Sequence, residues 1–140
     1  MRQFVTFRAD DHLLGIDILM VREINRLLDI TPVQHARDYV RGLINLRGQT
    51  VTVFDLGVRL GLPPLTISSS SHNIILKHED VGLLVDSIGD VVPVRSDAIE
   101  QPPANVGGIE SKFIEGVAKL ASELLVILSE KKLLEYDNSQ

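Results

Sequence analysis

The chain repeats two glycine-led blocks in the same order, and this repeat restricts the possible folds more than any other feature. "GIDILMVREI" begins at Gly15 and "GLLVDSIGDV" begins at Gly82, and both place apolar residues and one acid at the same offsets. "GLINLRGQTVTVFDL" begins at Gly42 and "GVAKLASELLVILSE" begins at Gly116. Each of these reads glycine, two apolar residues, a polar residue, leucine, a turn, an apolar strand and a helix-opening Asp or Ser. The order predicts two similar β-subdomains.

Most of the remaining segments are also short and rich in Val and Ile, with Gly, Pro, Asp or Ser at their ends. This pattern is typical of a barrel or sandwich and not of a helical bundle. Strands are expected at 3–7, 13–18, 22–30, 43–46, 50–53, 73–76, 81–85, 91–94, 113–120 and 124–128. Loops are expected at 10–12, at 101–108 and at the serine run 68–71, which we interpret as a flexible connector between the halves. The chain therefore reads as all-β.

Helical structure is expected in three short pieces. Asp55 is a suitable N-cap for a helix that ends before Gly61, and Ser129 is a suitable N-cap for a C-terminal helix. A single helical turn is expected at 36–40, stopped by Gly42. Residues 137–140 are expected to fray.

Composition limits the classes of partner. The chain has 140 residues, enough for one domain with a core. The net charge of −5 and the lack of a Lys/Arg cluster argue against nucleic acid as a partner. No apolar run approaches the roughly 20 residues of a membrane helix, so no direct membrane insertion is expected. With no signal-peptide pattern at the N-terminus, we expect a soluble, cytoplasmic protein.

Motifs for catalysis or metal binding are not found in the sequence. The four histidines lack metal-ligand spacing, there is no cysteine, and no GxSxG, GxGxxG or P-loop pattern occurs. We therefore expect no catalytic residue, no metal site and no cofactor. Two rivals stay open: a small β-barrel enzyme that uses Asp86 or Asp90 with a histidine, and a module that binds proline-rich peptides, for which the 4% of aromatic residues is low.

Arg47 is the residue that the repeat singles out. It lies at the tip of an apolar strand pair, and the other copy of the block has Ala121 at that position. The common architecture therefore does not require the cation, so Arg47 is either a solvated turn residue or a contact with a partner. Glu23 is the nearest acidic candidate to hold it, and the other copy retains acidity there as Asp90.

The motifs in this order resemble the CheW family of chemotaxis adaptors. The likeness includes "GLINLRGQTVTVFDL", "QFVTF" before "LLGIDILMVREI", "NIILKHEDVGLLVDSIGDVV" and "FIEGVAKLASELLVILSEKKLL", and it covers nearly the whole chain. It implies a single domain, 1–140, made of two packed five-stranded SH3-like barrels with short helices and a C-terminal helix. One subdomain would take roughly 1–13 plus 81–140 and the other roughly 14–80.

The resemblance also implies a function and a set of contacts. Such proteins are non-catalytic adaptors that couple the cytoplasmic tip of a chemoreceptor to the regulatory domain of the histidine kinase CheA, at membrane-associated receptor arrays. The array can serve flagellar chemotaxis or a pathway that controls pili or gene expression. The receptor-binding residues implied are Val21, Glu23, Gly42, Asn45, Arg47 and Gly48. The kinase-binding candidates are Ile30, Thr31 and Val33.

Overall fold

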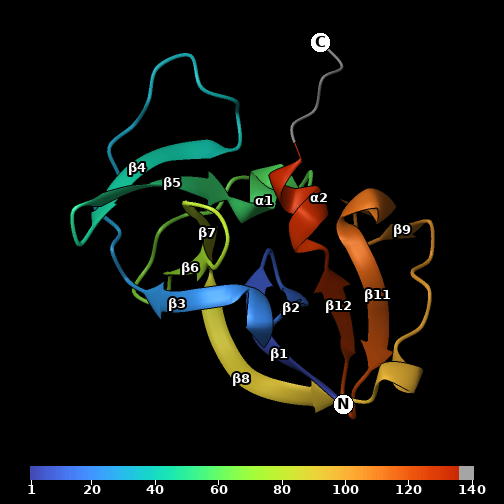
Figure 1. Cartoon of the computed structure of the whole chain (residues 1–140). Coiled ribbons are helices and arrows are strands. Elements are labelled where there is room, and N and C mark those ends of the chain that lie inside the picture. Colours follow the sequence, from blue (N-terminus) through green and yellow to red (C-terminus); the bar gives the residue numbers. More distant parts are fainter. Residues whose placement is uncertain (136–140) are drawn as a thin grey trace.

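The computed structural model describes residues 1–135. It contains two five-stranded mixed sheets, each with antiparallel pairs and one parallel pair and each curved into a barrel (Figure 1). In both barrels a loop segment beyond an edge strand closes the cylinder. Thr31 bridges to Leu43 in one, and Glu100 bridges to Val117 in the other. The all-β fold with two packed five-stranded barrels is confirmed.

The first sheet, barrel A, joins the two ends of the described chain. Its strand order is β11-β12-β2-β1-β8. The bounds are β11 (Ile114–Lys119), β12 (Leu124–Leu128), β2 (His12–Asp17), β1 (Arg2–Ala9) and β8 (Ser87–Val94). The small hairpin β9 (Asn105–Val106) and β10 (Ile109–Glu110) and the 3-10 turns η2 (Ser96–Ala98) and η3 (Ser111–Phe113) lie between β8 and β11.

The second sheet, barrel B, is built from the middle of the chain. Its strand order is β3-β6-β7-β5-β4. The bounds are β3 (Val21–Asn25), β6 (His72–Leu76), β7 (Val81–Val85), β5 (Gln49–Asp55) and β4 (Val40–Leu46). The 3-10 turn η1 (Ile18–Met20) links β2 to β3. Helix α1 (Leu56–Arg59) follows β5, and helix α2 (Glu130–Leu134) follows β12.

Strand register confirms the duplication. In barrel B, Gly42 and Gly82 both lie opposite Val53, one across an antiparallel ladder and one across a parallel ladder. The residues at the same three places in barrel A are Gly116, Gly15 and Ile127. Both helix caps are confirmed as well. The Asp55 side chain accepts from the Val58 amide and the Ser129 side chain accepts from the Lys132 amide, in each case three residues further along the chain.

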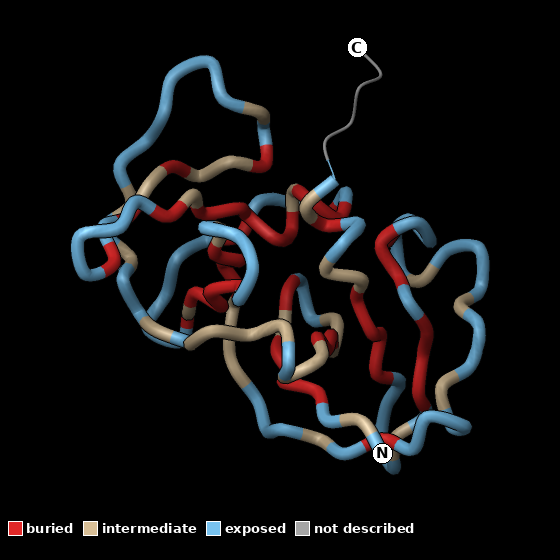
Figure 2. The backbone as a smooth tube through the Cα atoms, viewed as in Figure 1, coloured by how far each residue is buried: buried red, intermediate tan, exposed pale blue. Residues whose placement is uncertain are grey.

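One apolar core runs through both barrels, as the buried positions in Figure 2 indicate. The strands β7 and β12 are covered on both faces, so each buries every residue after its first. A smaller cluster around Phe4, Leu125 and Ile127 covers the far side of barrel A. The partner surfaces must therefore lie at barrel ends and edge strands.

Two expected elements are wrong. The strand expected at 22–30 ends at Asn25, because the Asn25 side chain accepts from the Leu27 amide and Asn73 donates to the Leu27 carbonyl at 2.7 Å, which diverts that backbone from a ladder. The helical turn expected at 36–40 is instead a single turn that leads into β4, in which the Val40 amide donates to the Arg37 carbonyl at 3.0 Å. Gly42 lies inside β4, at a bulge, and does not end a helix.

The serine run 68–71 does not connect the halves. It joins α1 to β6 inside barrel B, and Ser71 is buried, with its hydroxyl accepting from the Ser68 amide at 2.8 Å. The chain passes between the barrels at η1 and at Asp86. The sheets therefore divide the chain near 18–20 and 86, whereas we expected divisions at 13/14 and 80/81. The expected fraying of 137–140 lies outside the described residues.

Candidate functional site

The candidate site is built around a two-residue turn between β4 and β5. Both tip residues have positive φ, 50° at Arg47 and 85° at Gly48, as a tight hairpin of this length requires. The Asn45 side chain accepts from the Gly48 amide at 2.8 Å and braces the turn. The corresponding tip in barrel A, around Ala121, has no residue of positive φ. Asn45 and Gly48 thus shape the turn that displays Arg47.

Arg47 and Glu23 form an ion pair, as the sequence predicts. The Arg47 guanidinium donates to the Glu23 carboxylate, although 71% of the arginine side chain stays exposed. Glu23 also accepts from the Asn25 side-chain amide at 3.1 Å. The hydrogen bond from Arg47 is the main reason that the pKa of Glu23 lies below its ordinary value. The carboxylate therefore stays ionised and fixes the direction of an otherwise free arginine.

A second polar tie at the same barrel end was not predicted. Asp80, in the turn between β6 and β7, accepts from Gln49 at 2.7 Å and from Arg22 at 3.4 Å. These contacts link the hairpin tip to β3 and to the β6–β7 turn. Gln49 directly follows the tip, but nothing in the sequence pairs Asp80 with Arg22. The tie limits how far the tip can move relative to Glu23.

Gly42 has a structural role, because it is buried in β4 and its backbone φ is +148°. A Cβ added there would lie 2.1 Å from the Thr31 carbonyl oxygen. The close approach lets Thr31 exchange two backbone hydrogen bonds with Leu43, of 2.9 and 2.8 Å. The kinase candidates are placed by this contact: Ile30 packs on the core, and Val33 projects beyond it with 42% exposure.

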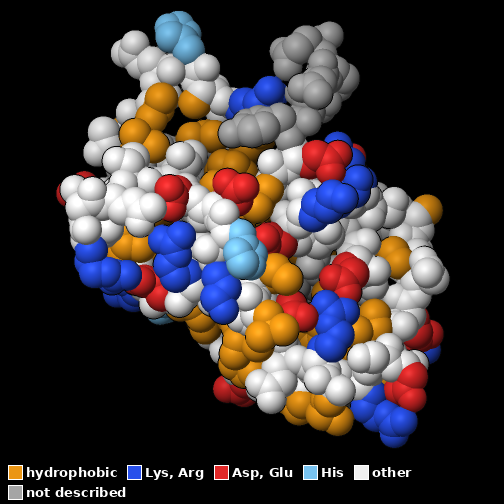
Figure 3. All heavy atoms as spheres, in the orientation of Figure 1, with side chains coloured by type: hydrophobic (Ala, Val, Ile, Leu, Met, Phe, Trp, Pro, Cys, Tyr) orange, Lys and Arg blue, Asp and Glu red, His pale blue; other side chains and the backbone are white. Residues whose placement is uncertain are grey.

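Apolar side chains are exposed on η1 and on one edge strand of each sheet, β3 and β8. Leu19 in η1 is 66% exposed, Ile24 in β3 is 37% exposed and Val91 in β8 is 47% exposed. Val21 is half-buried and packs against the core. Hydrophobic side chains also gather on the face shown in Figure 3, in the region between β3 and β8. Arg47 and Glu23 lie on the barrel B side of these residues, which suits a partner with an apolar stripe and polar flanks.

The rival chemistries find no assembled site in the described part of the chain. Asp86 accepts from the Asp10 amide at 3.0 Å and so serves the β1–β2 turn. Neither Asp86 nor Asp90 bonds to a histidine among residues 1–135. The same residues hold no cluster of three or more His, Asp or Glu with metal-binding geometry. None of the helices in residues 1–135 has the length and apolarity needed to cross a membrane.

Comparison with known proteins agrees with this geometry. The model of the CheW-like domain family matches residues 3–138. The chain is 34% identical to the chemotaxis protein CheW of Treponema pallidum (strain Nichols), over 94% of this chain and 81% of the relative. It is 31% identical to the chemotaxis protein CheW of Bacillus subtilis (strain 168), over 99% and 90%.

A solved structure gives the same result. The crystal structure of the scaffolding protein TtCheW from Thermoanaerobacter tengcongensis matches with a TM-score of 0.88 and 33% identity, over 97% of this chain and 89% of that chain. Sequence, fold and strand pattern thus agree over almost the entire length. The chain belongs to the CheW-like domain family and is a scaffold protein of the chemotaxis type.

Proposed function

We propose that the chain is a non-catalytic cytoplasmic adaptor that couples the cytoplasmic tip of a chemoreceptor to the regulatory domain of the histidine kinase CheA. Family membership supports the class of function. The observation that carries the assignment of the site is the Arg47–Glu23 pair, in which a carboxylate orients a cation whose side chain is 71% exposed.

The receptor tip would dock as a helical hairpin. An amphipathic helix presents an apolar stripe that can bury Leu19 and Ile24, and its polar flank can meet Arg47. The planar guanidinium offers directional donors that lysine does not match. Val21, Glu23, Asn45 and Gly48 would act at this surface, with Gly42 behind it as a backbone requirement. The loop of Ile30, Thr31 and Val33 would face the kinase domain.

The test measures two binding reactions separately. Wild-type protein is titrated calorimetrically with a receptor cytoplasmic fragment and, in a separate titration, with the CheA regulatory domain. Both titrations should give saturable heat. A folded sample that binds neither partner refutes the adaptor assignment.

Variants then locate the receptor site. Arg47→Ala should weaken binding of the receptor fragment about tenfold or more, because a charge-assisted hydrogen bond is lost. The matched control is Arg95→Ala, since the Arg95 side chain is also 71% exposed and paired with an acid, Asp97. The control should bind normally. Equal losses of affinity in the two variants would show that the receptor fragment binds elsewhere on the protein.

A double-mutant cycle tests whether Glu23 acts through Arg47. Glu23→Ala, Arg47→Ala and the double variant are compared for receptor binding. If Glu23 holds the arginine, the double variant loses less affinity than the two single losses combined. Strictly additive losses would refute the role of Glu23.

Val33→Asp should weaken binding of the kinase domain and leave receptor binding intact, as its exposed side chain belongs to the other candidate surface.

A further inference from the structure

Arg59, the last residue of α1, is buried although it is charged, with 9% of its surface exposed. Its guanidinium donates to three backbone carbonyls at the end of α2. The distances are 2.8 Å from Nε to Leu133, 2.6 Å from Nη2 to Glu135 and 3.3 Å from Nη2 to Lys132. The last carbonyls of a helix lack partners within the helix and carry its negative end. A residue of barrel B thus caps a helix of barrel A.

Two aromatic rings enclose the same guanidinium. Its central carbon lies 4.4 Å from the ring centre of Tyr39 and 4.9 Å from that of Phe113. Both distances are within the range of cation–π attraction, which strengthens when the cation is desolvated. Tyr39 directly precedes β4 in barrel B, and Phe113 ends η3 just before β11 in barrel A. The arginine therefore has a stacking partner on each barrel.

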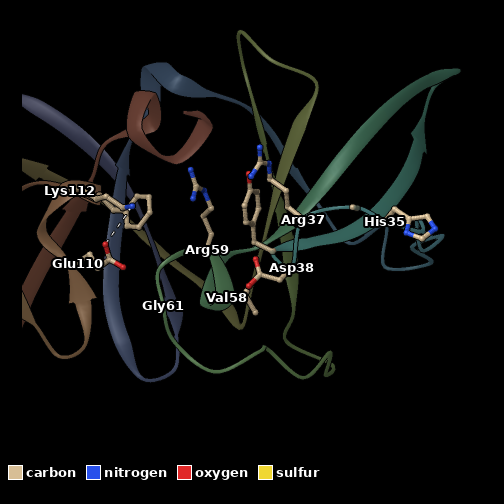
Figure 4. A pocket seen from close by; sticks show the side chains of 11 residues that line it. His35, Arg37, Asp38, Val58, Arg59, Gly61, Glu110 and Lys112 are labelled. Carbon is tan, nitrogen blue, oxygen red and sulfur yellow. Dashed lines mark ion pairs between the residues drawn. The ribbon is translucent and has the colours of Figure 1, made fainter. Parts of the chain in front are cut away.

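The surrounding cavity shows how the two barrels meet here. It has a volume of about 700 Å³ and is lined from both barrels. In Figure 4 the Arg59 side chain stands between Glu110 and Lys112 on one side and Arg37 and Asp38 on the other. Across this space Arg59 reaches from α1 to the backbone carbonyls at the end of α2.

The contact follows the internal duplication. The spacing that separates Gly42 from Gly116 also separates Tyr39 from Phe113, so the two rings are equivalent positions of the repeat. The same spacing relates Arg59 to Leu133, whose carbonyl it binds. Equivalent elements therefore face each other across the boundary. Because the other copy has leucine at this position, the fold of a single barrel does not require the arginine.

Much of the contact between the barrels in residues 1–135 is apolar core, and apolar burial is non-directional. Within these residues the backbone crosses between the two sheets at η1 and at Asp86. Three hydrogen bonds and two ring faces, in contrast, define one orientation of the guanidinium relative to both barrels. Lysine offers no planar fork for this arrangement.

We infer that Arg59 is a positioning residue that fixes the angle between barrel A and barrel B and thereby holds the partner surface in its binding shape. The second clause rests on the proposed function, because the exposed apolar residues of the candidate surface come from both sides of the boundary, Leu19 and Ile24 from η1 and barrel B and Val91 from barrel A. The first clause concerns the protein alone. The two clauses need separate measurements.

The angle is measured by distances between spin labels. The chain has no cysteine, so Lys77→Cys and Lys119→Cys introduce two unique labelling sites, exposed and on opposite barrels. Pulsed electron–electron double resonance should give one narrow distance distribution. Arg59→Met, which keeps an unbranched apolar stem and removes the donors and the charge, should at least double its width while circular dichroism stays that of a β-protein.

The matched control is Arg26→Met. Arg26 also donates to backbone carbonyls, those of Ser71 and Ser68, but all of these groups belong to barrel B. Its distribution should equal that of the parent. If Arg59→Met does not fold, Phe113→Leu decides the matter, because it removes only the ring on barrel A. Broadening there supports the inference. An unchanged distribution in folded Arg59→Met, or in Phe113→Leu when the former does not fold, overturns it.

Binding is the second readout. Arg59→Met should weaken binding of the receptor fragment about tenfold. Arg59→Lys should recover part of the lost affinity, and Arg26→Met should bind as the parent does. Normal binding by a variant with a broadened distance distribution overturns the link to the partner surface. Failure of the parent to bind refutes the proposed function, while the label distances still decide whether Arg59 fixes the angle.

Discussion

Replacing Gly42 by alanine should be among the most damaging single-methyl additions in this chain. The new Cβ would lie 2.1 Å from the Thr31 carbonyl oxygen, 2.6 Å from the Thr31 carbonyl carbon and 2.9 Å from Ile30 Cγ2. Two of these atoms are backbone, so no rotamer change relieves the contact. The segment that carries Thr31 must move away from β4.

The structure gives the size of the loss. Moving the segment breaks the two backbone hydrogen bonds between Thr31 and Leu43, together about 2 kcal/mol at ~1 kcal/mol each. An L-residue at φ of +148° adds about 1–3 kcal/mol of strain. The expected loss is therefore about 3–5 kcal/mol, a large share of the roughly 5–15 kcal/mol that stabilises an ordinary domain.

Urea unfolding followed by circular dichroism measures this loss, and Gly48→Ala is the matched control. Gly48 also has positive φ, +85°, but nothing lies within 4 Å of its added Cβ. It should lose only about 1 kcal/mol, the cost of an L-residue in the left-handed region. If Gly48→Ala is as unstable as Gly42→Ala, the close approach of Thr31 does not decide the effect and the reasoning fails.

The remaining predictions concern an N-cap pair and an acid. In urea unfolding, Asp55→Ala should lower the free energy of unfolding by about 3–5 kcal/mol, because the buried carboxylate caps α1 and also pairs with Arg41. The equivalent cap variant Ser129→Ala should lower it by only about 1 kcal/mol, and similar losses in the two variants would contradict this. The lowered pKa of Glu23 makes its stabilisation present above the ordinary pKa of 4.5 and lost as pH falls below it. Glu23→Gln should therefore be less stable than wild type at pH 7 in urea unfolding, and the difference should shrink as pH falls below 4.5; a pH-independent difference would contradict it.

Sequence reasoning succeeded where a structure depends on local chemistry or on the repeat. The strand bounds 81–85 and 124–128 and both helix caps are correct, since a short apolar run between polar residues and a capping side chain are both local features of the sequence. The Glu23–Arg47 pair was also predicted, because the other copy of the block has Ala121 in place of Arg47 and so marks this cation as one that the fold does not require.

Three of the differences share one physical cause, which is bonding from residues distant in the chain. Strand β3 stops at Asn25 because Asn73, on another strand, takes the Leu27 carbonyl. The serine run looked flexible, yet Ser71 is buried and its carbonyl binds Arg26. Asp80 joined the candidate site through Gln49 without any spacing pattern. No local pattern contains these partners, so only the folded chain reveals them.

The duplicated frame also explains where this chain can carry specific contacts. Glycines, strand order and helix caps agree between the copies, so they are set by the need to close each barrel. The copies differ at Arg47 against Ala121 and at Arg59 against Leu133, and in both cases barrel B carries the charge. One of these arginines is exposed beside Glu23, and the other is buried between the barrels. A scaffold needs both a recognition surface and a fixed geometry behind it, and these two departures from symmetry are placed to supply one each.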